Sequence, residues 1–123
     1  MDENRHICRA KRDPDGRWFE GNYVMLQGID GSLHLIIDRT GQYIRIDPET
    51  LGECTGCLDK LGRLIFEGDI IKDNEGTVYE VEYNGVDGGA FIGQRTKNMT
   101  YRYLHEINKP EIIGNVHEER LRM

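Results

Sequence analysis

The stretch that decides the fold runs from Cys54 to Lys72 and reads CTGCLDKLGRLIFEGDIIK. Its Asp59-Lys60-Leu61-Gly62 segment predicts a tight turn, because aspartate hydrogen-bonds its own backbone and glycine accepts a positive φ. The apolar residues on either side predict a hairpin with strands over 55–58 and 63–66. Short strands joined by a turn of this kind indicate a β-rich domain.

Gly68 and Asp69 interrupt the same stretch just before the apolar residues Ile70-Ile71-Lys72. Glycine permits a sharp backbone bend, and the aspartate side chain accepts hydrogen bonds from turn amides that would otherwise be unsatisfied. We therefore interpret Gly68 and Asp69 as a structural turn. A Gly-Asp step entering an apolar strand is typical of small SH3-like barrels, which bind peptides, nucleic acids or other subunits, so the fold by itself does not choose a function.

The rest of the chain continues this pattern of strands and turns. Strict alternation of apolar and polar residues, clearest in Tyr79-Glu80-Val81-Glu82-Tyr83, predicts half-buried strands. The expected strands cover residues 7–10, 17–26, 33–38, 42–47, 70–72, 77–83, 90–94 and 112–116. Residues 100–107 are ambiguous, with a short helix slightly favoured over a strand; 84–89 should form a flexible loop tip, and 117–123 a frayed helix turn.

The predicted fold is mainly β: a small barrel-like arrangement of short antiparallel strands with an SH3-like C-terminal portion and one or two short helices. Pro48 cannot continue a central strand because it lacks an amide donor, so 48–52 is expected to be a linker. We expect one domain over 1–123, divided into subdomains of approximately 1–50 and 51–123. Ile65, Ile70, Tyr79, Val81 and Ile113 are expected to share one buried core.

Composition excludes several classes of protein. The chain has 123 residues with 15 Gly, 3 Pro and 3 Cys, and a net charge of −6. No apolar run approaches the roughly 20 residues of a membrane span, and the N-terminal residues lack the apolar middle of a signal peptide. We therefore expect a cytoplasmic protein, without membrane contact and with free thiols.

A nucleic-acid interface is one hypothesis for the first subdomain. Basic residues and aromatic residues are interleaved near the N-terminus, and aromatic side chains in a basic groove can stack on bases. The candidate contacts are Arg9, Lys11, Arg17, Trp18 and Tyr23. Asp13 and Asp15 interrupt this cluster, and the net negative charge disfavours affinity for phosphate backbones. A solvated hairpin is the competing interpretation.

Candidate metal and catalytic motifs are weak. Cys54-x-x-Cys57 has the spacing of a zinc or redox pair, but the sequence offers no second pair and no helix N-terminus for it. Apolar packing is the better interpretation. Glu67, Asp69 and Asp73 could offer oxygen ligands to a divalent cation, yet their spacing is not that of a calcium loop. We expect no enzymatic activity, no catalytic residue and no cofactor.

The chain resembles the YopX family of phage and prophage proteins. The similarity rests on CTGCLDKLGRLIFEGDIIK, the flanking DPETLGE, YEVEY and IIGNVHE, and the opening CRAKRDPDGRWFEGNYV. It extends over essentially the whole chain, with Cys54, Cys57 and Leu61 departing from the usual Tyr, Leu and Asn. The resemblance implies a β-rich fold with an SH3-like portion, a phage or prophage origin, self-association, and no established enzymatic activity.

Partners follow from the same observations. Many short strands leave many sheet edges, and unpaired edges recruit further strands. Trp18, Phe19, Tyr101 and Tyr103 are more aromatic residues than one small core needs, and such residues are favoured at interfaces. The sequence therefore favours a homo-oligomer that also binds an unidentified phage or host protein, against the alternative of a monomer that packs these aromatic residues internally.

Overall fold

The computed structural model describes residues 7–84, 90–95 and 100–118, and within them it is mainly β, as predicted. The chain forms two compact units, residues 1–54 and 55–123, and it passes from one to the other within strand β5. Two antiparallel sheets have the strand orders β4-β3-β2-β1-β5-β6 and β10-β9-β8-β7-β11. Two 3-10 helices, η1 (Pro48–Thr50) and η3 (Leu104–Glu106), are the short helices of the described part.

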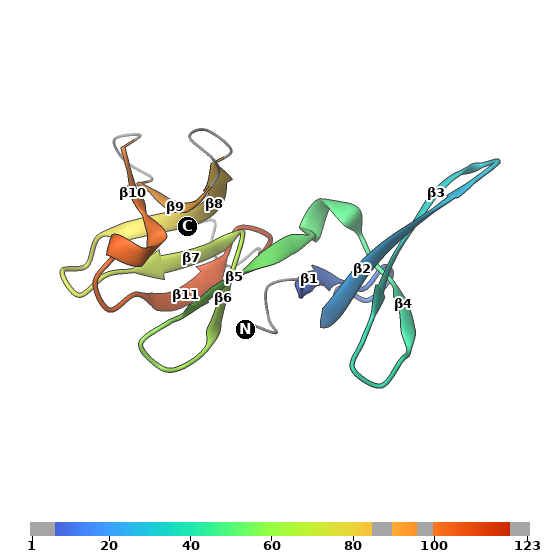
Figure 1. Cartoon of the computed structure of the whole chain (residues 1–123), viewed down its shortest axis with the longest axis horizontal. Helices are drawn as coiled ribbons and strands as arrows, with labels where there is room; N and C mark the ends of the chain where they lie inside the picture. The colour runs from blue at the N-terminus through green and yellow to red at the C-terminus, as the bar shows by residue number, and fades with distance from the viewer. Residues whose placement is uncertain (1–6, 85–89, 96–99, 119–123) are drawn as a thin grey trace. The chain divides into compact units, whose positions relative to one another are not determined.

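The first unit consists of four strands and the beginning of a fifth (Figure 1). Their bounds are β1 Cys8–Lys11, β2 Trp18–Gly28, β3 Gly31–Ile37, β4 Tyr43–Arg45 and β5 Gly52–Leu58. Ala10, Ile36, Ile44 and Ile46 form its buried core, with Phe19, Tyr23 and Leu51 packed against them. This core is small because it draws one or two residues from each element.

The second unit contains the end of β5, the hairpin partner β6 (Leu64–Phe66), and the second sheet. The sheet strands are β7 Asp69–Lys72, β8 Val78–Asn84, β9 Ala90–Arg95, β10 Tyr101–Tyr103 and β11 Glu111–Asn115. Its core consists of Ile65, Ile71, Tyr79, Val81, Leu104 and Ile107, with Cys57, Phe91 and Ile112 partly buried against it. The ambiguous segment 100–107 contains both predicted forms, since β10 runs directly into η3.

Two expectations about this second unit are corrected. Neither sheet closes into a barrel within the described residues, since no pairing joins its end strands, β4 with β6 or β10 with β11, and three of these four strands have only three residues. Ile70 and Ile113 do not belong to the core: Ile71 is fully buried, whereas Ile113 is 42% exposed. The pairing of β11 with β7 shifts register between Ile112 and Gly114, which displaces Ile113 from the core face.

Three hairpin loops share one hydrogen-bonded design, in which an aspartate begins the loop and a glycine follows three residues later. In Asp59-Lys60-Leu61-Gly62-Arg63, the Asp59 carboxylate accepts from the Leu61 and Arg63 amides, at 3.0 and 2.9 Å. The Gly62 amide donates to the Asp59 carbonyl oxygen, and Gly62 has a φ of 83°. The loops beginning at Asp38 and Asp73 repeat the same bonds. We call them the Asp loops.

The predictions for residues 84–89 and 117–123 fall mainly outside the described part of the chain. Within it, β8 extends through Asn84, and residues 116–118 follow β11 as a turn.

Candidate functional site

A basic and aromatic cluster lies on one face of the β1–β2 hairpin in the first unit. Arg9 and Lys11 alternate along β1, so their side chains leave the same face of the sheet. Trp18 is the cross-strand partner of Lys11. The Arg9 guanidinium carbon lies 4.7 Å and the Lys11 ammonium 5.4 Å from the centroid of the Trp18 ring. The cluster is therefore held together by cation–π contacts.

The other two predicted nucleic-acid contacts do not join this cluster. The Arg17 guanidinium lies 5.6 Å from the ring of Phe19, and Phe19 packs against the core on the opposite face of β2. Tyr23 also packs against that core, and its hydroxyl lies 2.6 Å from His34 Nδ1. Three of the five candidate residues thus share one surface. Because two cations already cover the Trp18 ring, it is a poor platform for base stacking.

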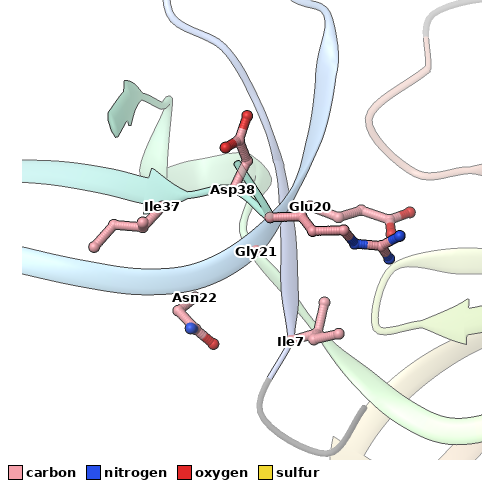
Figure 2. Close-up of a pocket in the computed structure, with 7 residues that line it drawn as sticks. Ile7, Glu20, Gly21, Asn22, Ile37 and Asp38 are labelled. Atoms are coloured by element: carbon pink, nitrogen blue, oxygen red, sulfur yellow. The ribbon is translucent and has the colours of Figure 1, made fainter. Parts of the chain in front are cut away.

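A small hollow of about 260 Å³ lies where β2 passes from one neighbour to the other. Strand β2 pairs with β1 up to Gly21 and with β3 from Asn22 onward. The hollow is lined by Ile7, Glu20, Gly21, Asn22, Ile37, Asp38 and Arg39. Figure 2 shows Asn22 and Asp38 pointing to opposite sides of the Gly21 backbone. The polar side chains that it labels therefore do not converge on one bound group.

Gly21 explains the shape of this hollow. A β-carbon at Gly21 would lie 2.2 Å from the carbonyl oxygen of Ile37, closer than any real contact. Only glycine lets the end of β3 pass this close to β2. In the sequence, Gly21 indicates a possible bulge in the strand expected over 17–26, and the close approach of Ile37 has no further signal beyond the glycine itself.

Asp38, at the edge of the hollow, is committed to its own loop. Its carboxylate accepts from the Thr40 hydroxyl at 2.7 Å and from the Gln42 amide at 3.0 Å. These hydrogen bonds, led by that of Thr40, lower the pKa of Asp38 below its ordinary value. A group whose acceptor sites are filled in this way is a structural anion and a poor general base.

Gly68 and Asp69 occupy a buried turn in the second unit. Gly68 has a φ of 94°, and its amide donates to the carbonyl oxygen of Val81. Asp69 is 1% exposed and accepts from the Phe66 amide at 2.8 Å and from the Asn115 side-chain amide at 3.1 Å. The carboxylate therefore connects the end of β6 to the end of β11.

The Asp59 carboxylate plays a similar connecting role and is fully buried. It accepts from the Arg63 guanidinium at 2.8 Å and from the Ile112 amide at 3.1 Å, which attaches the β5–β6 hairpin to β11. Burial opposes ionisation of Asp59, but donation from the Arg63 and Ile112 amides and from the guanidinium outweighs it and lowers its pKa. No ligand is needed to explain this site.

The cysteines and acidic residues show packing and turn roles. Cys8, Cys54 and Cys57 form no disulfide bond with one another; Cys54 is buried, and Cys57 packs against the second core. Asp73 anchors its Asp loop and accepts from the Tyr79 hydroxyl at 3.2 Å. Among residues 7–84, 90–95 and 100–118, no group of three His, Cys, Asp or Glu side chains could hold a metal ion.

The feature that the sequence analysis missed is the far part of the β2–β3 ribbon, over 22–34. Its exposed apolar residues include Met25 and Leu26, each 49% exposed, and Ile29, which is fully exposed at the tip. Sequence alternation alone does not reveal that such strands extend past the core. The signal present in the sequence is the near absence of charge: between Gly21 and Ile37 only Asp30 is acidic, and there is no Lys or Arg.

Comparison with known proteins places the chain in a family. A family model described as YopX protein matches residues 8–123, nearly the whole chain. No match was found among curated proteins. The described residues contain no helix long and apolar enough to cross a membrane. The chain belongs to the YopX protein family.

Proposed function

We propose that this chain is a phage- or prophage-derived accessory protein of the host cytoplasm that acts by binding other proteins, itself included. The observation that carries the proposal is the apolar part of the β2–β3 ribbon, with Met25, Leu26 and Ile29 exposed. Exposed apolar side chains gain free energy when a partner removes them from water. Met25 and Leu26 are consecutive in β2 and lie on opposite faces of the ribbon, so both faces expose apolar surface of the kind that interaction sites use.

Catalysis is not part of the proposal. The carboxylates with lowered pKa, Asp15, Asp38, Asp59 and Asp73, each accept hydrogen bonds from loop amides. Asp38 and Asp73 also accept from the hydroxyl groups of Thr40 and Tyr79, and these bonds belong to the same loops that the carboxylates stabilise. Binding is the activity that this surface supports.

The test is the mass of the full chain in solution. Light scattering over the micromolar range is expected to give a mass above the 14.2 kDa of one chain. A monomer mass at every concentration would overturn the self-association part of the proposal. Affinity capture from host cells, with and without induction of the phage element, then identifies further partners.

A nucleic-acid-binding module is the second candidate, favoured by the cluster of Arg9, Lys11 and Trp18. The net charge of −6 and the covered Trp18 ring oppose it. Retention on a DNA or RNA column in moderate salt, lost in a variant with Arg9→Ala and Lys11→Ala, would establish this function instead. We expect the protein to flow through.

A further inference from the structure

The β2–β3 ribbon extends beyond the strands that flank it. Strand β1 pairs with β2 only up to Gly21, and β4 pairs with β3 only from Leu35 to Ile37. At the outer end of the far part, residues 26–28 and 31–33 pair only with each other within the described chain (Figure 1), whereas the His34 carbonyl oxygen still accepts from the Ile46 amide. An isolated two-stranded ribbon is marginally stable at best, and three or more strands with an apolar face are needed for independent stability. The far part would therefore gain from an added strand.

The outer edge of β2 is available for such an added strand. Seven consecutive residues, Asn22–Gly28, pair with β3 on one side and with no strand on the other in the described part of the chain. Within the described residues, the end strands of the two sheets, β4, β6, β10 and β11, have three to five residues each. The edge of β4 is partly covered, because the Arg45 carbonyl oxygen accepts from the Asp13 amide. At β11, the Ile112 amide donates to the Asp59 carboxylate, and the Val116 amide just past the strand donates to the Gly68 carbonyl oxygen. The edge of β10 has three residues.

Charge identifies the occupant that fits this edge. The chain has a net charge of −6, and 31% of its residues are charged. When two copies approach through most of their surface, like charges therefore repel unless opposite charges pair with them. The segment Asn22–Gly28 reads NYVMLQG and carries no charge. Two copies of this edge can therefore meet without like-charge repulsion.

We propose that the edge of β2 pairs antiparallel with the same edge of a second copy, about a two-fold axis at Met25. This inference rests on the self-association proposed above and names its surface. In this arrangement Met25 lies opposite Met25, Val24 opposite Leu26, and Tyr23 opposite Gln27. Directly opposed residues share a face of the sheet, so Val24 and Leu26 of both copies join in one aliphatic patch. The two ribbons become one four-stranded sheet.

The two-fold axis makes Met25 the sharpest test. A charge introduced there faces the identical charge of the partner, whereas opposite charges in two different variants face each other favourably. The test measures self-association by sedimentation velocity over a concentration series. It compares Met25→Glu, Met25→Lys and their equimolar mixture with the wild-type chain. Leu61→Glu is the matched control, because Leu61 is also an exposed apolar residue, at 63%, but lies in a loop of the second unit.

Each single Met25 variant is expected to weaken self-association by roughly tenfold or more, since like charges juxtaposed at an interface are strongly unfavourable. The mixture should regain wild-type association, and Leu61→Glu should match the wild type. The thermal midpoint of each variant, measured where the chains are dissociated, should equal that of the wild type, which separates lost association from lost folding.

Two results would overturn the inference and leave the proposed function standing. One is a wild-type oligomer that Met25→Glu does not weaken. The other is a mixture that fails to re-associate although both single variants dissociate, which would refute the two-fold axis at Met25. A wild-type monomer at all concentrations would overturn both the inference and self-association.

Discussion

The two units of this protein use their apolar residues differently. The second unit buries six residues in one core and attaches its hairpins through the buried carboxylates of Asp59 and Asp69. The core of the first unit has four buried residues, and the far part of β2 and β3 is exposed. The second unit thus makes more buried contacts of its own, whereas the first exposes the apolar surface on which the proposed self-association rests.

The largest loss of stability is expected from a substitution in the core of the second unit. Ile71→Ala should lower the free energy of unfolding by about 2–5 kcal/mol, because it removes buried surface and leaves a cavity. Ile70→Ala should cost less, since Ile70 lies on the other face of β7 and is only half-buried. Chemical denaturation of both variants measures this, and equal losses would show that the assignment of faces is wrong.

The next largest loss of stability is expected from a substitution in the first unit, at Gly21. Gly21→Ala places a methyl group against the Ile37 carbonyl and should cost about 1–3 kcal/mol or more, as overpacking does. Gly28→Ala is the control in the same strand, where the nearest atom, the Gly31 carbonyl oxygen, lies 3.3 Å from the added carbon. If Gly28→Ala destabilised the chain as much as Gly21→Ala, the close approach of β3 would not be its cause.

Two substitutions of Asp69 distinguish the contribution of its hydrogen bonds from that of its charge. Asp69→Ala leaves the Phe66 amide and the Asn115 side chain without their acceptor and should cost about 1–3 kcal/mol. Asp69→Asn keeps one acceptor oxygen and should cost less. Thermal denaturation compares the two variants; equal losses would favour a role for the charge over turn capping.

Acid should destabilise the second unit through its buried carboxylate. The pKa of Asp59 is lowered in the folded chain, so its stabilising contribution is complete above the ordinary value of 3.8 and is lost as the pH falls through the folded pKa. Asp59→Asn removes this titration and should flatten the decrease in stability below about pH 4. An unchanged acid profile in that variant would assign the decrease to other groups.

The smallest effect is expected at the tip of the ribbon. Ile29→Ala should change the free energy of unfolding by less than about 0.5 kcal/mol, as exposed substitutions usually do, because Ile29 packs against nothing in one copy. Denaturant titration at low protein concentration tests it. A loss of stability comparable to that of Ile71→Ala would mean that the tip of the ribbon is packed in a core and is not exposed.

The sequence was most informative where alternation and turn chemistry agree. Tyr79 and Val81 are buried as predicted, because polar Glu80 and Glu82 mark the opposite face of β8. In Ile70-Ile71 two adjacent β-branched residues give no alternation, so the sequence does not show which one faces the core. The prediction that Ile70 is the buried one is wrong, because Ile71 is fully buried. Ile113 was misplaced because the register shift of β11 is set by its partner β7.

The candidate site was less predictable than the fold. Arg9, Lys11 and Trp18 meet because strand register places them on one face, which alternation could foresee. Arg17 and Tyr23 contact other residues because β2 continues past the hairpin and its odd-numbered residues face the core. How far β2 extends beyond its neighbours depends on where β1 and β4 end, and short strands leave those ends undefined in the sequence.

The Asp loops also bear on the order of folding. Each closes a hairpin between residues only four apart, with bonds supplied by the loop itself, and hairpins of this kind form within microseconds. The pairing of β7 with β11 instead joins residues 39 to 46 positions apart, and closing so long a loop costs entropy before any contact compensates for it. We therefore expect the local hairpins to form first and the docking of β11 to limit the folding rate, so that C-terminal truncations slow refolding more than changes within the loops.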